Sequence, residues 1–141
     1  MNTIQLDIEK IDSKIIDGIE FKNCIIILVS IDGRLTQDID FLRNGLVVLS
    51  ELSKSKDNPG TYLIFTDPSG IADAGGWAGV EVGHSDDRIT WEVKKYPDRL
   101  RFEFSKELYL NAISKMLAKV NAIVPTVDVE PTSFFPPESW D

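Results

Sequence analysis

The 141-residue sequence predicts an α+β fold, a mainly antiparallel sheet of five or six strands with two principal helices packed on it. Two kinds of pattern lead to this prediction. Residues 88–95 and 99–104 alternate apolar and polar side chains with a period of two, which is typical of half-buried strands. Residues 36–53 and 106–121 repeat apolar side chains with a helical period. A chain of this length is expected to form a single domain.

The N-terminal part predicts two strands. Residues 3–8 alternate as an amphipathic strand does, whereas residues 9–18 could form a turn or a short helix. Residues 20–31 contain a run from Cys24 to Val29 that is apolar on both faces, so this strand should be central and covered on both sides. One helix on each face, or both helices on one face with the C-terminal segment on the other, would provide that cover.

The middle of the chain predicts a helix, a strand, a loop and a meander. Thr36 is a suitable N-cap for the helix at 36–53, and residues 61–66 read as a strand. The glycine- and aspartate-rich residues 67–76 should form a loop, which three strands at 77–83, 88–95 and 99–104 follow. The outer face of the last hairpin carries four basic side chains interspersed with Glu92 and Glu103, a pattern that favours a solvated charge ladder over a phosphate site.

The C-terminal part predicts a helix and an extended tail. Ser105 should cap the helix at 106–121. The remainder, residues 122–141, contains four prolines, and its last part, residues 130–141, is a proline-rich tail. Val127 and Val129 could form an edge strand. Aromatic residues in the tail indicate that it docks on a surface, either of its own domain or of a partner: Phe134, Phe135 and Trp140.

Composition restricts the class of function. The chain has 23 acidic and 15 basic side chains, a net charge of −8, so nucleic acid should be repelled and a basic partner attracted. Solubility alone would also account for this charge. A single cysteine excludes an internal disulfide and favours a reducing cytoplasm. Neither a signal peptide nor an apolar run of about 20 residues is present, so no membrane association is expected.

The loop at 67–76 is the first candidate site, because it is longer than a hairpin connection requires. Asp67 and Asp73 could bind a cation or a basic side chain. The loop lacks the Gly-Lys-Ser/Thr of a P-loop and the alternating acids of an EF-hand. The alternative is a structural loop whose Trp77 packs into the core.

The remaining candidates favour structural roles. His84 lies beside Asp86 and Asp87 and could act as a base or metal ligand, but adjacent polar residues are also what a hairpin connection needs. A transition-metal site would need a second histidine or cysteine ligand. Cys24, in an apolar strand, is expected to be a small buried hydrophobe. We therefore expect no catalytic residue, no metal and no cofactor, and a binding protein rather than an enzyme.

The order of elements also carries a family resemblance. From Arg88 to Trp140 the chain runs strand, turn, strand, amphipathic helix and proline-bearing tail. Together with the acidic balance of the whole chain, this third of the chain resembles the small cytoplasmic immunity proteins of bacterial contact-dependent and polymorphic toxin systems. The resemblance implies a protein that binds one cognate toxin domain and blocks its active site, without catalytic residues of its own.

The expected mechanism is occlusion of a basic toxin domain by an acidic surface. We expect two loops on one sheet to supply the contacts, through Asp67, Asp73, Trp77, Asp86 and Asp87. Two other functions remain open at this point. One is a small enzyme or ligand-binding domain with a pocket under the loop from Asp67 to Trp77, and the other is an accessory or assembly subunit that docks through its tail.

Overall fold

The computed structural model describes residues 1–123 and 126–140 and confirms the α+β class. Residues 124, 125 and 141 of the expected extended segment lie outside the described residues. The helices are α1 (Leu49–Ser55) and α2 (Lys106–Ile123), and short 3-10 turns occupy Thr36–Asp38, Asp40–Leu42, Ala72–Gly75 and Glu138–Trp140. The strands are β1 (Ile4–Ile16), β2 (Ile19–Ile31), β3 (Arg34–Leu35), β4 (Leu46–Val47), β5 (Gly60–Tyr62), β6 (Phe65–Thr66), β7 (Trp77–His84), β8 (Arg88–Lys95), β9 (Asp98–Ser105) and β10 (Asp128–Val129).

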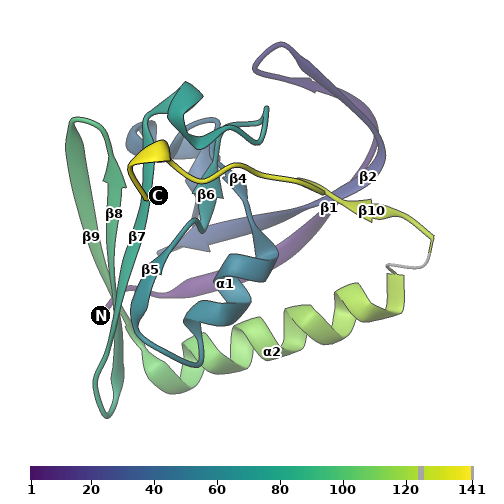
Figure 1. The fold of residues 1–141 in the computed structure, drawn as a ribbon. Coiled ribbons are helices and arrows are strands. Elements are labelled where there is room, and N and C mark those ends of the chain that lie inside the picture. Colours follow the sequence, from purple (N-terminus) through teal and green to yellow (C-terminus); the bar gives the residue numbers. More distant parts are fainter. Residues whose placement is uncertain (124–125, 141) are drawn as a thin grey trace.

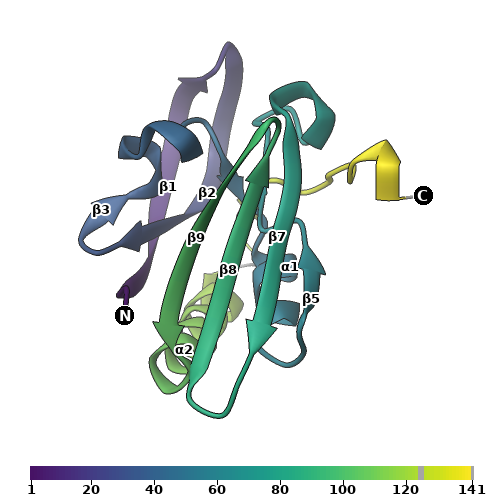
Figure 2. The same ribbon diagram turned by 90° about the vertical axis from the view of Figure 1, so that its left-hand side faces the viewer.

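The strands belong to two larger sheets and a short ribbon. The first sheet has the order β1-β2-β10, with β3 also paired to β2, and the second is the predicted meander extended by one strand, in the order β5-β7-β8-β9. The ribbon pairs β4 with β6. Figure 1 shows α2 running beneath β1 and β2, with its first turns beside the lower part of the meander, and Figure 2 shows the meander face-on. Among the strands named above, all pairings are antiparallel except that of β10 with β2.

The strand β2 is central and covered on both faces, as predicted. It lies between β1 on one edge and β10 with β3 on the other. Ile25, Ile27 and Val29 face the main core, whereas Cys24 and Ile26 face a second buried cluster that includes Leu46 of β4. The ambiguous residues 9–18 complete β1 and a tight turn at Asp17 and Gly18, which have φ of +50° and +79°. Positive φ at both turn residues matches the right-handed twist of a hairpin.

The helix predicted at residues 36–53 is wrong, because only its last part is helical. Two 3-10 turns and β4 precede α1, which begins at Leu49. Asn44 has a φ of +65°, and a Cβ atom on Gly45 would lie 2.7 Å from the ring of Trp77. The chain therefore leaves the helical conformation at Asn44, and Gly45 packs closely against the Trp77 indole. Three consecutive residues, 46–48, are buried, which suits a short strand between two apolar layers better than a helix.

The strand predicted at residues 61–66 is divided between two sheets. β5 pairs with β7, and β6 pairs with β4. Leu63 and Ile64 connect β5 to β6 and are completely buried. The Leu63 backbone N–H donates to Oε1 of Glu51 over 3.1 Å, so an acidic side chain of α1 satisfies a donor that the sheet leaves unpaired.

A buried chain of hydrogen bonds joins the meander to both helices. Trp91 Nε1–H donates to the Tyr109 hydroxyl over 3.0 Å, and that hydroxyl lies 2.6 Å from Oγ of Ser55. Ser55 donates its proton to the carbonyl of Leu52 over 2.5 Å, so Tyr109 is the donor to Ser55. The chain Trp91→Tyr109→Ser55→Leu52 therefore has one direction, and it leaves no donor in it unsatisfied.

The N-terminal residues link the two sheets. The Asn2 backbone N–H donates to the Glu103 carbonyl over 2.7 Å, and the Glu103 N–H donates to Asn2 Oδ1 over 2.9 Å. The same Asn2 side chain donates to Asp32 over 2.8 Å. The Thr3 backbone N–H and the Asn2 amide lower the pKa of Asp32. Asn2 thus fixes the start of β1 against the edge of β9.

Removal of the Tyr109 hydroxyl should destabilise the fold. In Tyr109→Phe the Trp91 N–H loses its acceptor, and in Ser55→Ala the Tyr109 hydroxyl loses its own. Each change should cost about 1–3 kcal/mol in urea unfolding, because a buried donor is left unpaired. The double variant should cost less than the two losses added together, since both remove the same bond. Tyr62→Phe, whose hydroxyl donates to the Asn58 carbonyl at the surface, is the control and should cost under about 0.5 kcal/mol. A Tyr109→Phe variant as stable as the control contradicts this assignment.

Alkaline pH should weaken the fold through the same residue. Burial raises the pKa of Tyr109 to about 12, against the opposing effect of its hydrogen bonds with Ser55 and Trp91. Above about pH 10 the unfolded chain loses this proton while the folded chain keeps it, so stability falls by up to roughly 1.4 kcal/mol per pH unit. Tyr109→Phe should lack this component. The free energies of unfolding of the two proteins should converge between about pH 10 and 12. A constant difference would exclude a buried neutral Tyr109 as the cause.

Candidate functional site

The five predicted contact residues do not form one surface. Asp67, Asp73 and Trp77 lie at the start of β7, whereas Asp86 and Asp87 follow its end. β7 has eight residues, which at ~3.3 Å per residue separates its ends by about 23 Å. The expectation that both loops cluster on one sheet is therefore corrected. They share the sheet, but they lie at opposite ends of the same strand.

Trp77 packs inside the protein, as the structural alternative for this loop anticipated. Its side chain is 3% exposed and stacks on Phe65 with ring centroids 5.8 Å apart. Nζ of Lys95 lies 4.5 Å from the centroid of the indole. Burial lowers the pKa of Lys95, and the nearby Asp67 carboxylate acts in the opposite direction. Trp77 thus supports the loop from below and is not available to a partner.

The two aspartates of the loop hold local structure in place. Asp67 Oδ2 accepts the backbone N–H of Ser69 over 3.0 Å and its hydroxyl over 2.6 Å, an arrangement that closes a turn. Asp73 is exposed, and its Oδ2 accepts the backbone N–H of Glu138 over 3.2 Å. One carboxylate therefore shapes the loop, and the other joins the loop to the C-terminal tail.

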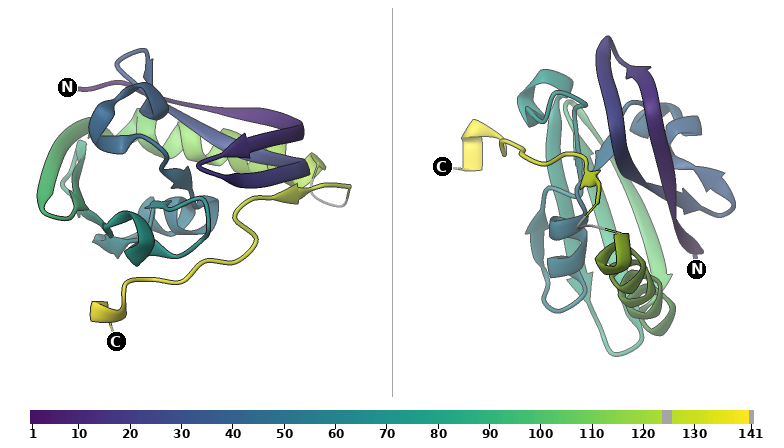
Figure 3. Two further views of the ribbon diagram at one scale, coloured as in Figure 1. Left: turned by 90° about the horizontal axis from the view of Figure 1, so that it is seen from above. Right: turned by 90° about the vertical axis from the view of Figure 1, so that its right-hand side faces the viewer.

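The tail docks on its own domain. β10 adds to β2, and the next N–H, from Glu130, donates to the Ile25 carbonyl over 3.0 Å. Farther along, the Phe135 N–H donates to the Gly70 carbonyl over 2.7 Å, and Phe135 accepts the Ala72 N–H over 3.1 Å. A Cβ atom on Gly79 would lie 2.5 Å from the Trp140 ring, so the missing side chain makes room for the indole. Figure 3 shows the tail along the outside of the molecule.

The loop, the β8–β9 turn and the tail together form a surface that we call the loop–tail face. It exposes Ile71 (47%), Tyr96 (84%), Phe135 (60%) and Trp140 (38%). The Tyr96 backbone N–H donates to the Gly76 carbonyl over 2.8 Å, and Phe135 forms an isolated β-bridge with Ile71. The β8–β9 turn and the tail therefore both contact the loop through their backbones. Asp73 and Glu138 add exposed carboxylates. Exposed aromatic side chains beside polar residues are typical of protein interfaces.

His84 ends β7 at the β7–β8 hairpin and contacts the end of α1. Its Nε2 lies 2.8 Å from the Ser55 carbonyl, so Nε2 carries the proton. The Ser85 N–H donates to the Arg88 carbonyl over 2.9 Å and closes the connection in which Asp86 and Asp87 are exposed. Within residues 1–123 and 126–140, no three His, Cys, Asp or Glu side chains gather closely enough to hold a metal ion.

Cys24 has the environment of a buried hydrophobe. Its side chain is 3% exposed in the second core cluster. Burial, and then the charges of Glu130 and Asp128, raise the pKa of its thiol. A thiol with a raised pKa carries little thiolate at neutral pH and is a poor nucleophile.

The basic residues of the meander form the predicted charge ladder. Lys94 pairs with Glu81 at 2.9 Å, and Arg99 pairs with Glu92 at 2.7 Å. Arg88 pairs with Glu103, and this contact raises the pKa of the arginine while it lowers that of the glutamate. The positive charge of this surface is therefore compensated within the sheet.

Comparisons with protein-family models, with curated proteins and with solved structures found no match to this chain. Neither helix among the described residues has the length and apolar character needed to cross a bilayer. The candidate site consequently rests on geometry alone. Sequence reasoning missed Tyr96 and Ile71, although the Tyr96-Pro97 pair at a hairpin turn was visible in the sequence.

A methyl group at Gly70 should loosen the tail. Gly70 has a φ of +83°, and its Cβ would lie 2.7 Å from the Ser133 carbonyl oxygen. Gly33, with a φ of +80° and no atom within 4 Å of its Cβ, is a matched control. Both alanine variants carry a backbone cost of about 1–2 kcal/mol, but only Gly70→Ala should also speed amide exchange at Phe135 and at residues 128–140. Equal exchange in the two variants would mean that the tail is not held against Gly70.

Proposed function

We propose that this protein is a binding protein that neutralises a cognate bacterial toxin domain in the cytoplasm by covering the toxin's active site with the loop–tail face. The observation that carries the proposal is the concentration of Ile71, Tyr96, Phe135 and Trp140 at one end of the meander. The net charge of −8 supports a basic partner. The family resemblance of the segment from Arg88 to Trp140 agrees with this assignment.

The rings and the carboxylates have different roles in this mechanism. Tyr96 and Phe135 supply large apolar areas that become desolvated on contact, which is the usual source of interface free energy. Asp73 and Glu138 lie beside them and favour basic side chains at the rim. Long-range attraction between opposite net charges speeds encounter at low salt. Effective protection requires nanomolar affinity, about −12 kcal/mol.

Hydrogen bonds within the protein order the face before the partner arrives. Backbone hydrogen bonds join Phe135 to both Gly70 and Ala72, and the buried Trp77 supports the loop. Little conformational entropy is lost when such a surface binds, so more of the contact energy is available as affinity.

Asp86 and Asp87 lie outside the contact surface in this mechanism. They lie about 23 Å from the loop, beyond the Debye length of ~8 Å at physiological salt. Reversal of their charge should therefore change affinity less than removal of a single ring from the loop–tail face.

We expect the reading frame directly upstream of this chain to encode the cognate toxin domain, and the test uses the domain found there. The two proteins should co-purify, and Tyr96→Ala combined with Phe135→Ala should weaken binding by at least ~30-fold in calorimetry. Ile15→Ala is the control, because Ile15 is 69% exposed at the far end of the β1–β2 hairpin. Its affinity should equal that of the unaltered protein. Tight binding that survives the double substitution would remove the loop–tail face as the site, and absence of binding by the unaltered protein would remove the proposed function.

A further inference from the structure

The outer edge of β1 has backbone groups without a strand partner. The Thr3 carbonyl accepts the Asp32 N–H over 3.0 Å, so Thr3 directs its backbone groups toward β2. Backbone direction alternates along a strand, and therefore Ile4, Leu6 and Ile8 direct their N–H and C=O groups outward. The Ile8 N–H is occupied by Asp7 Oδ1 at 3.0 Å. The available edge thus runs from Ile4 to Leu6.

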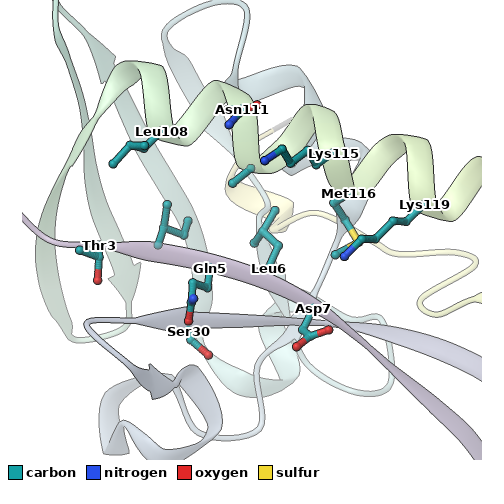
Figure 4. A pocket seen from close by; sticks show the side chains of 12 residues that line it. Thr3, Gln5, Leu6, Asp7, Ser30, Leu108, Asn111, Lys115, Met116 and Lys119 are labelled. Atoms are coloured by element: carbon teal, nitrogen blue, oxygen red, sulfur yellow. The ribbon is translucent and has the colours of Figure 1, made fainter.

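This edge borders a groove between β1 and α2 (Figure 4). The groove has a volume of about 420 Å³, within the range of ligand sites. Leu108 of α2 is 58% exposed and contributes apolar surface to the groove, whereas Met116 lies at its buried base. An exposed strand edge alongside a helix suits an extended peptide, because backbone pairing supplies affinity and the helix contacts alternate side chains.

The charge on the helix side of the groove is positive. Lys115 and Lys119 line it one turn apart and make no ion pair within 4.0 Å in the described part of the chain. Like charges at this spacing destabilise a helix slightly, and a bound carboxylate would relieve that repulsion. Asp7, from β1, is the one carboxylate among the described residues that line the groove, against the two lysines of α2 (Figure 4).

The lysines also distinguish between possible occupants. Pairing of β1 with β1 of a second copy by a two-fold axis would bring two α2 helices together at their lysines, and repulsion opposes that arrangement. We propose that the groove binds an extended acidic peptide segment of another protein as an additional strand on β1, with its carboxylates toward Lys115 and Lys119. The groove shares no residue with the loop–tail face, so this second surface does not depend on the proposed function.

The experiment uses the full chain and a capped, fluorescent peptide of about eight residues that alternates valine and glutamate, a length typical of strands. The peptide should bind at low salt, and its valine–lysine counterpart should not. Hydrogen exchange followed by NMR should show new protection at the amides of Ile4 and Leu6, and no change at Gln5 and Asp7, which already face β2. This alternation separates strand addition from attachment to the lysines alone.

A charge-reversal pair completes the test. Lys115→Glu with Lys119→Glu should weaken binding of the acidic peptide at least about tenfold, whereas Lys22→Glu with Lys54→Glu changes net charge equally and should not. Lys22 and Lys54 are exposed on β2 and α1, away from the groove. Absence of binding, equal effects of the two double variants, or binding without protection at Ile4 and Leu6 would each overturn the proposal. A dimer in light scattering that protects these amides would assign the groove to a second copy instead and overturn it as well.

Discussion

The need to cover both faces of β2 organises this fold. Ile25 and Ile27 on one face, with Cys24 and Ile26 on the other, cannot be hidden by a single layer. The main core covers the first face, and the β4 segment with the curled β1–β2 hairpin covers the second. β10 then pairs with β2, and this pairing starts the tail on its path toward the 67–76 loop. The candidate site is thus a consequence of how the central strand is buried.

The second constraint is a polar network inside an aromatic core. Trp91 lies at the centre of this core, with ring centroids 5.0 Å from Phe104, 5.9 Å from Phe65 and 6.0 Å from Tyr109. Its N–H needs an acceptor that the two phenylalanine rings lack, and the Tyr109 hydroxyl supplies it. Satisfied buried networks favour one arrangement of their elements. Because Phe65 also stacks on Trp77, the same core carries the loop that bears Asp67 and Asp73.

Some of this structure could be predicted from local pattern, and some could not. The alternation at 88–95 and 99–104 specified the meander, since period two admits few other structures. The run from Cys24 to Val29 specified a central strand for a different reason, because it is apolar on both faces. Residues 36–53 misled because their apolar side chains cover half a helical wheel, whereas the break depends on Gly45 passing under Trp77, a contact distant in sequence. Long-range contacts of this kind leave no local signal.

The candidate site could likewise be predicted only in part from the sequence. The length and composition of residues 67–76 indicated a special loop, but whether Trp77 would be buried or exposed was not decided by sequence. The pairing of Asp86 and Asp87 with that loop failed because it ignored the length of β7. The position of Phe135 depends on where the tail docks, and therefore on the hydrogen bond from its N–H to the Gly70 carbonyl.

The central claim is that the protein works through a preformed surface of loop and tail. The most direct measurement is hydrogen–deuterium exchange of the protein bound to its proposed partner, a toxin domain, compared with the free protein. We predict protection concentrated in residues 67–76, at Tyr96 and in residues 133–140. Protection confined to the connection at residues 84–88 or to the outer face of the meander, with the loop and tail unchanged, would contradict the account.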